Sequence, residues 1–284
     1  MKVGFIGAGK VGIAFGKYLK EKKIEVIGYF DRNIENSINS SNFTKTKTFK
    51  NIKELVNCSD IIFITVNDDE IEEVSQNIIK TNLIINKKKF LHMSGAMSTK
   101  ILKTLENSGA NVYSLHPLQS FVEVSKAVED LYKTYFSLEG NIKKDDEIIG
   151  LLNKLGNKYF IITQEQKAKY HMSACIFSNY LVTLMDFGTN ILEDIGIQRD
   201  EGFEAMYPLI EGTLENIKKV GTKKALTGPI ARGDIGTIVK HIESFQENEN
   251  NNKEIYKFLG QKSLDLSNIS EIKKDKILEI LKND

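Results

Sequence analysis

Three glycines near the start of the chain form a pattern with a defined chemical use. Gly7, Gly9 and Gly12 make up G-x-G-x-x-G within the segment KVGFIGAGKVG. The first glycine of such a pattern permits a tight turn, the second lets the backbone approach a pyrophosphate, and the third allows close helix–strand packing. The pattern follows a strand-like run and opens a helix-like one, which indicates a dinucleotide site. The residues expected at its phosphate end are Gly7, Ala8, Gly9, Lys10, Val11 and Gly12.

Asp31 and Arg32 end the second strand-like run, where the dinucleotide fold places its ribose contact. An acidic residue there binds the ribose 2′-hydroxyl of NAD, whereas an arginine accepts the 2′-phosphate of NADP. Arg32 is one of only three arginines in a lysine-rich chain, the others being Arg199 and Arg232. We therefore expect NADP, and NAD stays open as the alternative.

Further candidate residues follow later strand-like runs. Val66 and Asn67 follow one run, and Ser94 and Gly95 follow the next. Because ligands gather outside the carboxyl ends of parallel strands, we expect these four residues to contact the cofactor. His116 follows another run in a proline-fixed turn, where a site role and a structural role are equally open.

A helix-like segment in the second half, KYHMSACIFSNYL, carries polar groups on one face. His171, Cys175 and Asn179 are spaced four residues apart, so they line one side of the helix. Polar groups on an otherwise apolar helix need partners when they are buried. Tyr170 is expected to point away from this face and to belong to the core.

The segment LTGPIARGD contains Arg232 at the entrance of a further expected helix. A guanidinium group can bind a carboxylate through two parallel hydrogen bonds, which lysine cannot do. Two uses stay open for Arg232, a clamp on a substrate carboxylate or a structural pairing with an aspartate. Asp234 is expected to cap the helix that follows.

The pattern of the first 163 residues predicts a domain in which strands and helices alternate. Short apolar runs alternate with amphipathic stretches, which is typical of a parallel sheet covered on both faces. The expected strands are Lys2–Ile6, Ile24–Phe30, Asp60–Val66, Phe90–Met93, Val112–Leu115, Tyr135–Leu138 and Tyr159–Ile162. From Gln164 onward only helices are expected, over Gln164–Leu192, Arg199–Val220, Ile235–Gln246, Lys253–Leu264 and Glu271–Leu281, with a loop at Gln246–Lys253. The fold class is therefore α/β, with a Rossmann-type, mostly parallel sheet in residues 1–163 followed by an all-helical domain in residues 164–284.

The composition argues against several classes of protein. The chain has 284 residues, 41% of them hydrophobic and 27% charged, and a formal net charge of +1. A general nucleic-acid binder carries a strong basic excess, and no apolar run reaches the roughly 18 residues that a membrane helix needs. Cys58 and Cys175 give no disulfide framework and no signal peptide is visible, so a cytoplasmic protein is expected. The scattered histidines and cysteines indicate no metal site.

Five segments together resemble a known family. They are TVNDDEI, LHMSGAM, SLHPLQSF, KYHMSACIFSNYL and LTGPIARGD. In this order, after the glycine pattern, they resemble a bacterial family of Rossmann-like candidate reductases with a helical C-terminal domain of unknown function. That family belongs to the superfamily of ketopantoate reductase, pyrroline-5-carboxylate reductase and 6-phosphogluconate dehydrogenase. The resemblance covers residues 1 to 265 and implies NAD(P)H-dependent hydride transfer to a small substrate bound between the domains.

The resemblance also suggests roles for particular residues. His171 stands where related reductases place a catalytic lysine, and Asn179 matches a later asparagine, whereas Cys175 departs from the pattern. His171 is then expected to donate a proton or to orient the carbonyl, and Asn179 to bind the substrate or the nicotinamide. Related helical domains interlock as dimers, so a homodimer is expected by resemblance.

The predicted function is reduction of a small carboxylate-bearing 2-keto acid, with ketopantoate as the best candidate and Arg232 as the carboxylate clamp. An imine reductase resembling pyrroline-5-carboxylate reductase is the alternative within the same class. A dinucleotide-binding sensor without turnover is the alternative from another class, and a non-nicotinamide carrier such as a deazaflavin is also open. The catalytic group is expected to comprise His171, Asn179, Arg232 and His116.

Overall fold

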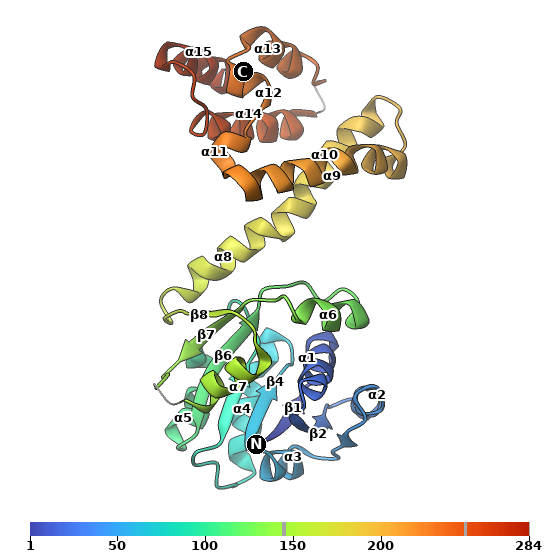
Figure 1. The fold of residues 1–284 in the computed structure, drawn as a ribbon, viewed down its shortest axis with the longest axis vertical. Helices are drawn as coiled ribbons and strands as arrows, with labels where there is room; N and C mark the ends of the chain where they lie inside the picture. Colours follow the sequence, from blue (N-terminus) through green and yellow to red (C-terminus); the bar gives the residue numbers. More distant parts are fainter. Residues whose placement is uncertain (144–145, 247–248, 284) are drawn as a thin grey trace. The chain divides into compact units, whose positions relative to one another are not determined.

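An eight-stranded sheet organises the first part of the chain (Figure 1). The structure is a computed structural model that describes residues 1–143, 146–246 and 249–283. The strand order is β3-β2-β1-β4-β5-β6-β7-β8, and every neighbouring pair is parallel except β6 and β7. The strands are β1 (Lys2–Ile6), β2 (Glu25–Phe30), β3 (Lys47–Thr48), β4 (Ile61–Ile64), β5 (Lys89–His92), β6 (Asn111–Pro117), β7 (Phe136–Gly140) and β8 (Tyr159–Ile161). The predicted fold class is confirmed.

Helices cover both faces of the sheet, which explains why the central strands are apolar throughout. On one face, α1 (Lys10–Glu21), α6 (Val124–Leu131) and α7 (Glu147–Leu155) bury their apolar sides in a shared core. On the other face, a second core includes residues of α3 (Ile52–Cys58), α4 (Ile71–Lys80) and α5 (Lys103–Asn107). All four residues of β4 are buried, as expected for a strand between two such layers.

The reversal between β6 and β7 determines how the chain leaves the sheet. β7 runs back from Pro117 at the carboxyl end of β6, and β8 lies parallel to β7. β8 ends level with Leu115, two residues before β6 ends at Pro117 and within one residue of the level at which β1, β4 and β5 end. Helix α8 (Lys167–Phe177) begins soon after β8. An α-helix rises about 1.5 Å per residue. Over its length, α8 therefore passes the carboxyl ends of the parallel strands, and its side chains lie beside them.

Some elements were not expected from the sequence. Helix α2 (Ile34–Thr44) is rich in serine and asparagine, which have weak helix propensity. The Asn33 side chain caps it by accepting a hydrogen bond from the Glu35 amide, and Ser40 donates to the Asn36 carbonyl within the helix. Tertiary burial of such serines therefore overrides propensity here. Strand β3 and helix α6 are further additions.

The chain divides into two compact units, residues 1–180 and 181–284. The expected domain boundary at residues 163 and 164 stays a prediction. After β8 the described residues contain helices and no strand. The expected helix over Gln164–Leu192 is interrupted at Ser178, where α8 ends and α9 (Asn179–Asp194) follows.

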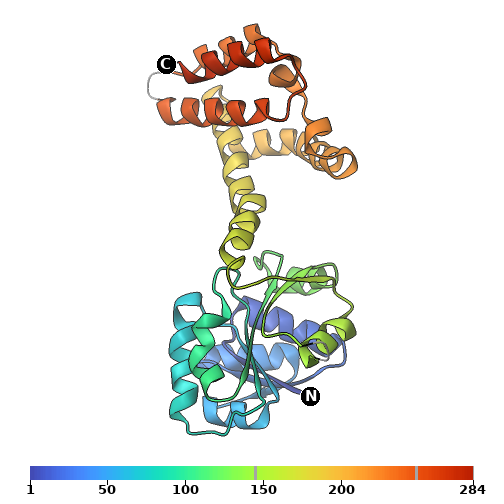
Figure 2. The same ribbon diagram turned by 90° about the vertical axis from the view of Figure 1, so that its left-hand side faces the viewer.

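The described residues of the second unit form six further α-helices, and the last three share an apolar core that includes Ile238, Leu264, Ile277 and Leu281. The six helices are α10 (Arg199–Val220), α11 (Thr222–Ala225), α12 (Gly228–Arg232), α13 (Ile235–Glu243), α14 (Asn250–Leu264) and α15 (Glu271–Lys282). Helices α14 and α15 lie side by side (Figure 2). The loop expected at Gln246–Lys253 is wrong from Asn250 onward, where α14 begins, and residues 247–248 lie outside the described part.

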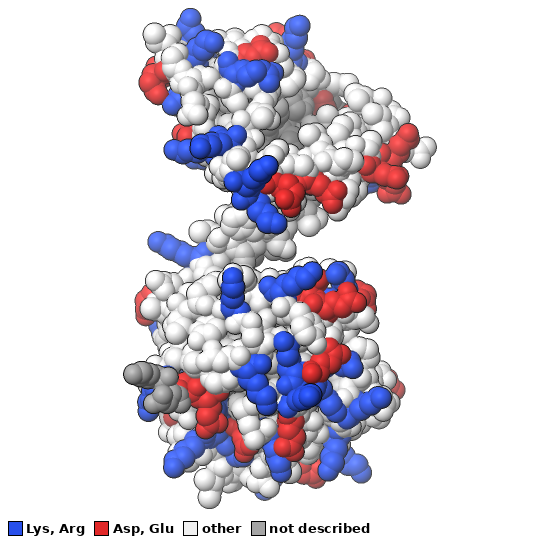
Figure 3. Space-filling view, in the orientation of Figure 1, with Lys and Arg blue, Asp and Glu red and all other residues white. Residues whose placement is uncertain are grey.

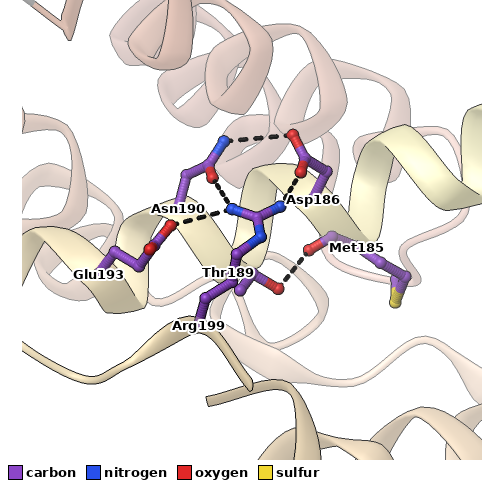
Figure 4. A network of polar contacts seen from close by, with 6 residues as sticks. All are labelled: Met185, Asp186, Thr189, Asn190, Glu193 and Arg199. Atoms are coloured by element: carbon purple, nitrogen blue, oxygen red, sulfur yellow. Dashed lines mark hydrogen bonds and ion pairs between the residues drawn. The ribbon is translucent and has the colours of Figure 1, made fainter. Parts of the chain in front are cut away.

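Arg199 ties the start of α10 to α9 (Figure 4). Its guanidinium group donates to Asn190 Oδ1 at 2.6 Å and to Glu193 Oε2 at 2.9 Å, and it also pairs with Asp186. Five fixed donors in one plane suit such a convergent set of acceptors. Arg199 therefore supports the turn between the two helices.

Charges of both signs alternate over the surface of the first unit seen in Figure 3, in keeping with the net charge of +1. Within residues 1–143, 146–246 and 249–283, no helix is long and apolar enough to cross a membrane.

Candidate active site

The glycine turn between β1 and α1 has the geometry that its sequence predicts. Gly7 has a φ of 98°, and a Cβ atom on it would lie 2.6 Å from the Thr65 carbonyl carbon. A Cβ on Gly12 would lie 2.5 Å from Thr65 Oγ1, so the helix can pack against β4 only with a glycine there. In contrast, no atom of the described residues lies within 4 Å of such a Cβ on Gly9. The backbone at Gly9 is thus open to a ligand.

A cavity of about 480 Å³ opens at this turn. It lies at the carboxyl ends of β1, β2 and β4, where the sheet changes winding direction and open α/β sheets bind their ligands. Val66 and Asn67 follow β4 and line it, as expected. No side chain among the described residues caps the N-terminus of α1. The first backbone amides of this helix therefore remain available to a ligand in the cavity. The lining residues are Ile6, Gly7, Gly9, Phe30, Asp31, Arg32, Asn36, Ile52, Thr65, Val66, Asn67, Glu70, Glu73, Val74 and Asn77.

Asp31 braces the glycine turn. Its Oδ2 atom accepts a hydrogen bond from the Ala8 amide at 2.8 Å, and its Oδ1 atom accepts one from the Asn33 amide at 2.9 Å. Both carboxylate oxygens, and the Ala8 amide expected to face phosphate, therefore have partners within the protein. Lys10 Nζ donates to the Val122 carbonyl at 2.8 Å.

Arg32 lines this cavity just beyond the end of β2 and forms an ion pair with Glu70. The Arg32 side chain is largely exposed, whereas that of Glu70 is more buried. Glu70 was not expected from the sequence, because it lies in the acidic run NDDE, where nothing distinguishes one carboxylate from the next. The arginine thus shares the cavity with a carboxylate that neutralises it.

Ser94 and Gly95 follow β5, the strand between β4 and β6. Ser94 Oγ donates to Asp68 Oδ2 at 2.7 Å and accepts from the Met97 amide at 3.0 Å, so it fixes two loops at this edge. A Cβ on Gly95 would lie 2.5 Å from His171 Nδ1 and 2.8 Å from His116 Nε2. Gly95 therefore leaves room for two imidazole rings that come from different elements.

A second cavity, of about 700 Å³, lies where α8 passes the carboxyl end of β6. His116, His171 and Asn179, all expected to act in the reaction, line it together. The complete lining is His116, Leu118, Gln119, Ser120, Phe160, Tyr170, His171, Ser173, Ala174, Cys175, Phe177, Ser178 and Asn179. The predicted face of α8 therefore does meet the predicted strand end.

Tyr170 corrects one expectation. It does not point away from this region, but lines the cavity, and its hydroxyl group lies 2.5 Å from His116 Nδ1. The expectation was wrong because it considered only the side of the helix that carries His171, Cys175 and Asn179. Helix α8 meets β6 on the Tyr170 side as well as on the His171 side. His171 Nε2 lies 3.5 Å from Cys175 Sγ, and His171 Nδ1 has no hydrogen-bond partner among the described residues.

Lys167 is a further residue that sequence reasoning missed. Its side chain is only 1% exposed, and its Nζ atom donates to Ser114 Oγ at 2.6 Å. Burial lowers the Lys167 pKa to about 8, although Glu139 and Asp68 favour its charged form. One lysine in a lysine-rich chain gives no signal by itself. Its place one turn before Tyr170 and His171 was the available hint.

Two histidines near this edge are held neutral. Burial lowers the pKa of His116 to about 3, with the Lys167 and His171 charges adding to the effect. Burial also lowers the pKa of His92 to about 3, and this side chain is fully buried.

Arg232 belongs to the second unit, whereas both cavities lie in the first. It is exposed and ends the short helix α12, and two residues separate it from α13, the helix at whose entrance it was expected. Asp234 caps α13 as predicted, accepting from the Thr237 amide at 3.1 Å. Across the described ranges, no group of three or more His, Cys, Asp or Glu side chains could hold a metal ion.

Two family models match the chain. The Rossmann-like domain matches residues 1–117, and the domain of unknown function DUF2520 matches residues 134–263. This chain combines a Rossmann-like domain with a DUF2520 domain. That combination confirms the resemblance to Rossmann-like candidate reductases with a helical C-terminal domain. The DUF2520 domain contains β7, β8 and α8, so it contributes Tyr170 and His171 to the second cavity. No curated protein sequence matches the chain.

Several solved structures share the fold over nearly the whole chain. A candidate NADP oxidoreductase from Bacteroides fragilis has a TM-score of 0.75 and 18% identity, covering 93% of this chain and 98% of its own. Protein TM1727 from Thermotoga maritima has a TM-score of 0.69 and 26% identity, covering 99% and 100%. Pyrroline carboxylate reductase from Plasmodium falciparum, solved with NADP bound, has a TM-score of 0.60 and 17% identity, covering 94% and 98%.

Proposed function

We propose that this chain is an NADP-dependent oxidoreductase that reduces a small carbonyl compound. The observation that carries the proposal is the glycine turn, which presents an open backbone at Gly9 and an uncapped helix N-terminus to a cavity at the switch point of the sheet. Such a site favours the anionic pyrophosphate of a dinucleotide. The NADP oxidoreductase and the NADP-bound reductase that share the fold support this choice. When bound, NADPH supplies the hydride for the reduction.

The cavity favours NADP over NAD. Both oxygens of Asp31 accept backbone hydrogen bonds, so this carboxylate is already used as a brace. Arg32 is the cationic side chain beside it in the cavity lining, and a guanidinium group suits a 2′-phosphate. We propose that the backbone from Gly7 to Gly12 holds the pyrophosphate and that Val66, Asn67 and the Ser94–Gly95 loop border the nicotinamide half.

The second cavity is the proposed substrate site. Its size suits a small organic acid, and it presents two imidazoles, a phenol and a thiol. His171 has a buried nitrogen without a partner among the described residues, so we assign it to hold the substrate oxygen, while Asn179 binds another polar group of the substrate. For the substrate, a 2-keto acid such as ketopantoate is the first candidate. A cyclic imine acid is the second, supported by the shared fold of the Plasmodium falciparum enzyme.

The test is a binding and turnover panel. NADPH and NADH affinities are measured by calorimetry, and nicotinamide oxidation is then followed with ketopantoate, other 2-keto acids and cyclic imines. We expect NADPH to bind more tightly and one of these substrates to be reduced. Tight binding without any turnover would identify a sensor, and absence of dinucleotide binding would overturn the proposal. With the active substrate, Arg232→Lys is expected to raise KM with little change in kcat if Arg232 clamps its carboxylate.

We also propose that the chain forms a homodimer through α10. Five apolar side chains on this helix fall within one stripe of about 100° and are each more than a third exposed. They are Phe203, Met206, Tyr207, Leu214 and Ile217. An apolar stripe on a soluble protein marks an interaction surface, and a second copy of the chain is the partner that superfamily resemblance predicts.

A further inference from the structure

We propose that Tyr170 is the proton source behind His116, and that His116 passes a proton from its Nε2 atom to the substrate. This inference rests on the proposed reductase function and assigns the acid of that reaction. It makes His116 a catalytic residue and Tyr170 a residue that acts through it.

The geometry gives the two nitrogen atoms of His116 different tasks. Nδ1 lies 2.5 Å from the Tyr170 hydroxyl oxygen, and the two rings meet edge to face with centroids 5.6 Å apart. Nε2 lies on the opposite side of the ring, beside Gly95 at the end of β5. If the phenol donates to Nδ1, the imidazole carries its own hydrogen on Nε2, since a neutral ring has one N–H. The hydrogen available to a substrate is then on the atom that faces the β5 end.

The charge state of His116 explains why it needs a second group. Burial lowers its pKa to about 3, so the ring is neutral near pH 7 and cannot act as an imidazolium acid. A neutral imidazole can still transfer a proton if it gives one from Nε2 while it takes one at Nδ1. The Tyr170 hydroxyl is in hydrogen-bond contact with Nδ1 and can provide that proton.

Each hydrogen transferred in the reduction has a defined source. Addition of a hydride to the carbonyl carbon reduces the substrate, oxidises NADPH to NADP⁺ and leaves the electron pair of the C=O bond on oxygen. That oxygen takes the hydrogen from His116 Nε2 and becomes a hydroxyl group. Nδ1 takes the phenolic hydrogen of Tyr170, which leaves a phenolate and the other neutral tautomer of His116. To reset the pair, Nε2 takes a proton from solvent water and Nδ1 returns its hydrogen to the phenolate, so one solvent proton is consumed in each turnover.

Lys167 positions and stabilises this pair. Its Nζ atom lies 5.7 Å from the centroid of the Tyr170 ring and is anchored by its hydrogen bond to Ser114. A cation within about 6 Å of an aromatic face is attracted to it, so Lys167 helps to hold the Tyr170 ring in place. Burial raises the pKa of Tyr170, and its interaction with the Ser137 side chain acts in the opposite direction. Glu139 and Asp68 keep the ammonium form available, because both act to raise the Lys167 pKa.

His171 does not fit the same role. Its Nε2 atom lies 3.5 Å from Cys175 Sγ, and its Nδ1 atom has no partner among the described residues, so the group behind it is a thiol, a weaker hydrogen-bond donor than a phenol. It lies close to His116, with ring centroids 6.0 Å apart. This placement suits a group that holds the substrate oxygen while His116 delivers the proton.

The first test needs neither cofactor nor substrate. Nitrogen-15 NMR of the labelled wild-type protein near pH 7 reports which His116 nitrogen carries the hydrogen, with His116→Asn identifying the signal. We expect hydrogen on Nε2 in the wild type and a mixture of both tautomers in Tyr170→Phe, which keeps the ring but removes the hydroxyl. Hydrogen on Nδ1 in the wild type would overturn the proposal, because Nε2 would then have none to give.

The second test uses the active substrate. Tyr170→Phe is expected to lower kcat by about a hundredfold and to remove the solvent isotope effect of proton transfer, with KM and NADPH affinity changed less than about twofold. Tyr159→Phe, on β8 and outside the cavity lining, is the matched control and keeps wild-type kcat. An unchanged kcat in Tyr170→Phe contradicts the relay while leaving the reductase function intact. If no substrate is reduced, the reductase function fails, and the NMR result still decides the His116–Tyr170 geometry.

Discussion

Arg32 and Glu70 share the proposed ribose end of the first cavity, and their ion pair occupies the guanidinium group that is proposed to bind the 2′-phosphate. A 2′-phosphate entering this end has to compete with the Glu70 carboxylate for the guanidinium group. An exposed ion pair of this kind is worth about 0.2–1 kcal/mol, so competition lowers NADP affinity without preventing binding. We therefore expect Glu70 to tune the preference between the two dinucleotides.

Glu70→Gln is expected to strengthen NADPH binding about two- to fivefold and to leave NADH binding almost unchanged, because only NADPH carries the 2′-phosphate. Calorimetric titration with each dinucleotide measures both effects. Glu73→Gln is the matched control, since Glu73 lines the same cavity and has no ion pair among the described contacts. Equal gains for NADPH and NADH would contradict a specific role for Glu70.

At the scale of elements, helix α8 is docked on the sheet through a buried amine. Lys167, in the first turn of α8, donates to Ser114 on β6, and Ser114 in turn lies 3.4 Å from the Ser94 carbonyl beyond β5. Burial lowers the Lys167 pKa to about 8, well below its usual 10.5. The helix therefore gains its anchor at the cost of keeping an ammonium group away from water.

This cost predicts a dependence of stability on pH. Between about pH 8 and pH 9.5 the unfolded chain keeps the Lys167 proton while the folded chain releases it, so the free energy of unfolding rises with pH. For one group the slope is at most about 1.4 kcal/mol per pH unit. Urea unfolding across this range is expected to show the rise in the wild type and a smaller rise in Lys167→Met, where Lys88, whose pKa burial also lowers, still contributes. The pH range ends below 10 because of buried Tyr29, whose pKa is raised by burial. Above pH 10 the unfolded chain loses the Tyr29 proton before the folded chain does, which lowers the free energy of unfolding as the pH rises. A variant with the wild-type slope would contradict the assignment.

The sequence was sufficient to predict the bounds of elements that have a regular apolar pattern and a clear boundary residue. Strand β1 and helix α10 have the predicted bounds, and the glycine turn has the predicted geometry. The reversal of β7 could not be predicted, because parallel and antiparallel strands in a covered sheet have the same apolar pattern.

The sequence was less informative about side chains that meet across elements. The Tyr170–His116 contact depends on where α8 crosses β6, which helix phase alone does not contain. The contacts of Glu70 with Arg32 and of Lys167 with Ser114 could not be predicted either, because the chain has many acidic and lysine side chains and the sequence does not show which of them lies near each partner.

At the scale of the whole molecule, the apolar stripe on α10 predicts self-association. A stable homodimer buries roughly 800 Å² per partner, and charge at the centre of an interface disrupts it. Leu214→Lys is expected to yield monomer in sedimentation experiments at concentrations where the wild type is dimeric. Asn216→Lys, on the opposite side of the same helix, adds the same charge and leaves the dimer intact. A monomeric wild-type protein would contradict the proposal.

The absence of a side chain at Gly95 has an evolutionary consequence. Any larger residue there forces at least one of the imidazoles of His116 and His171 to move, since their nitrogens lie within 3.0 Å of the Cβ position. Substitutions at these three positions are therefore coupled, and descendants of a common ancestor should lose or retain them together. The glycine and the two histidines form a signature that separates relatives with this pair of imidazoles from those that have inherited only the fold.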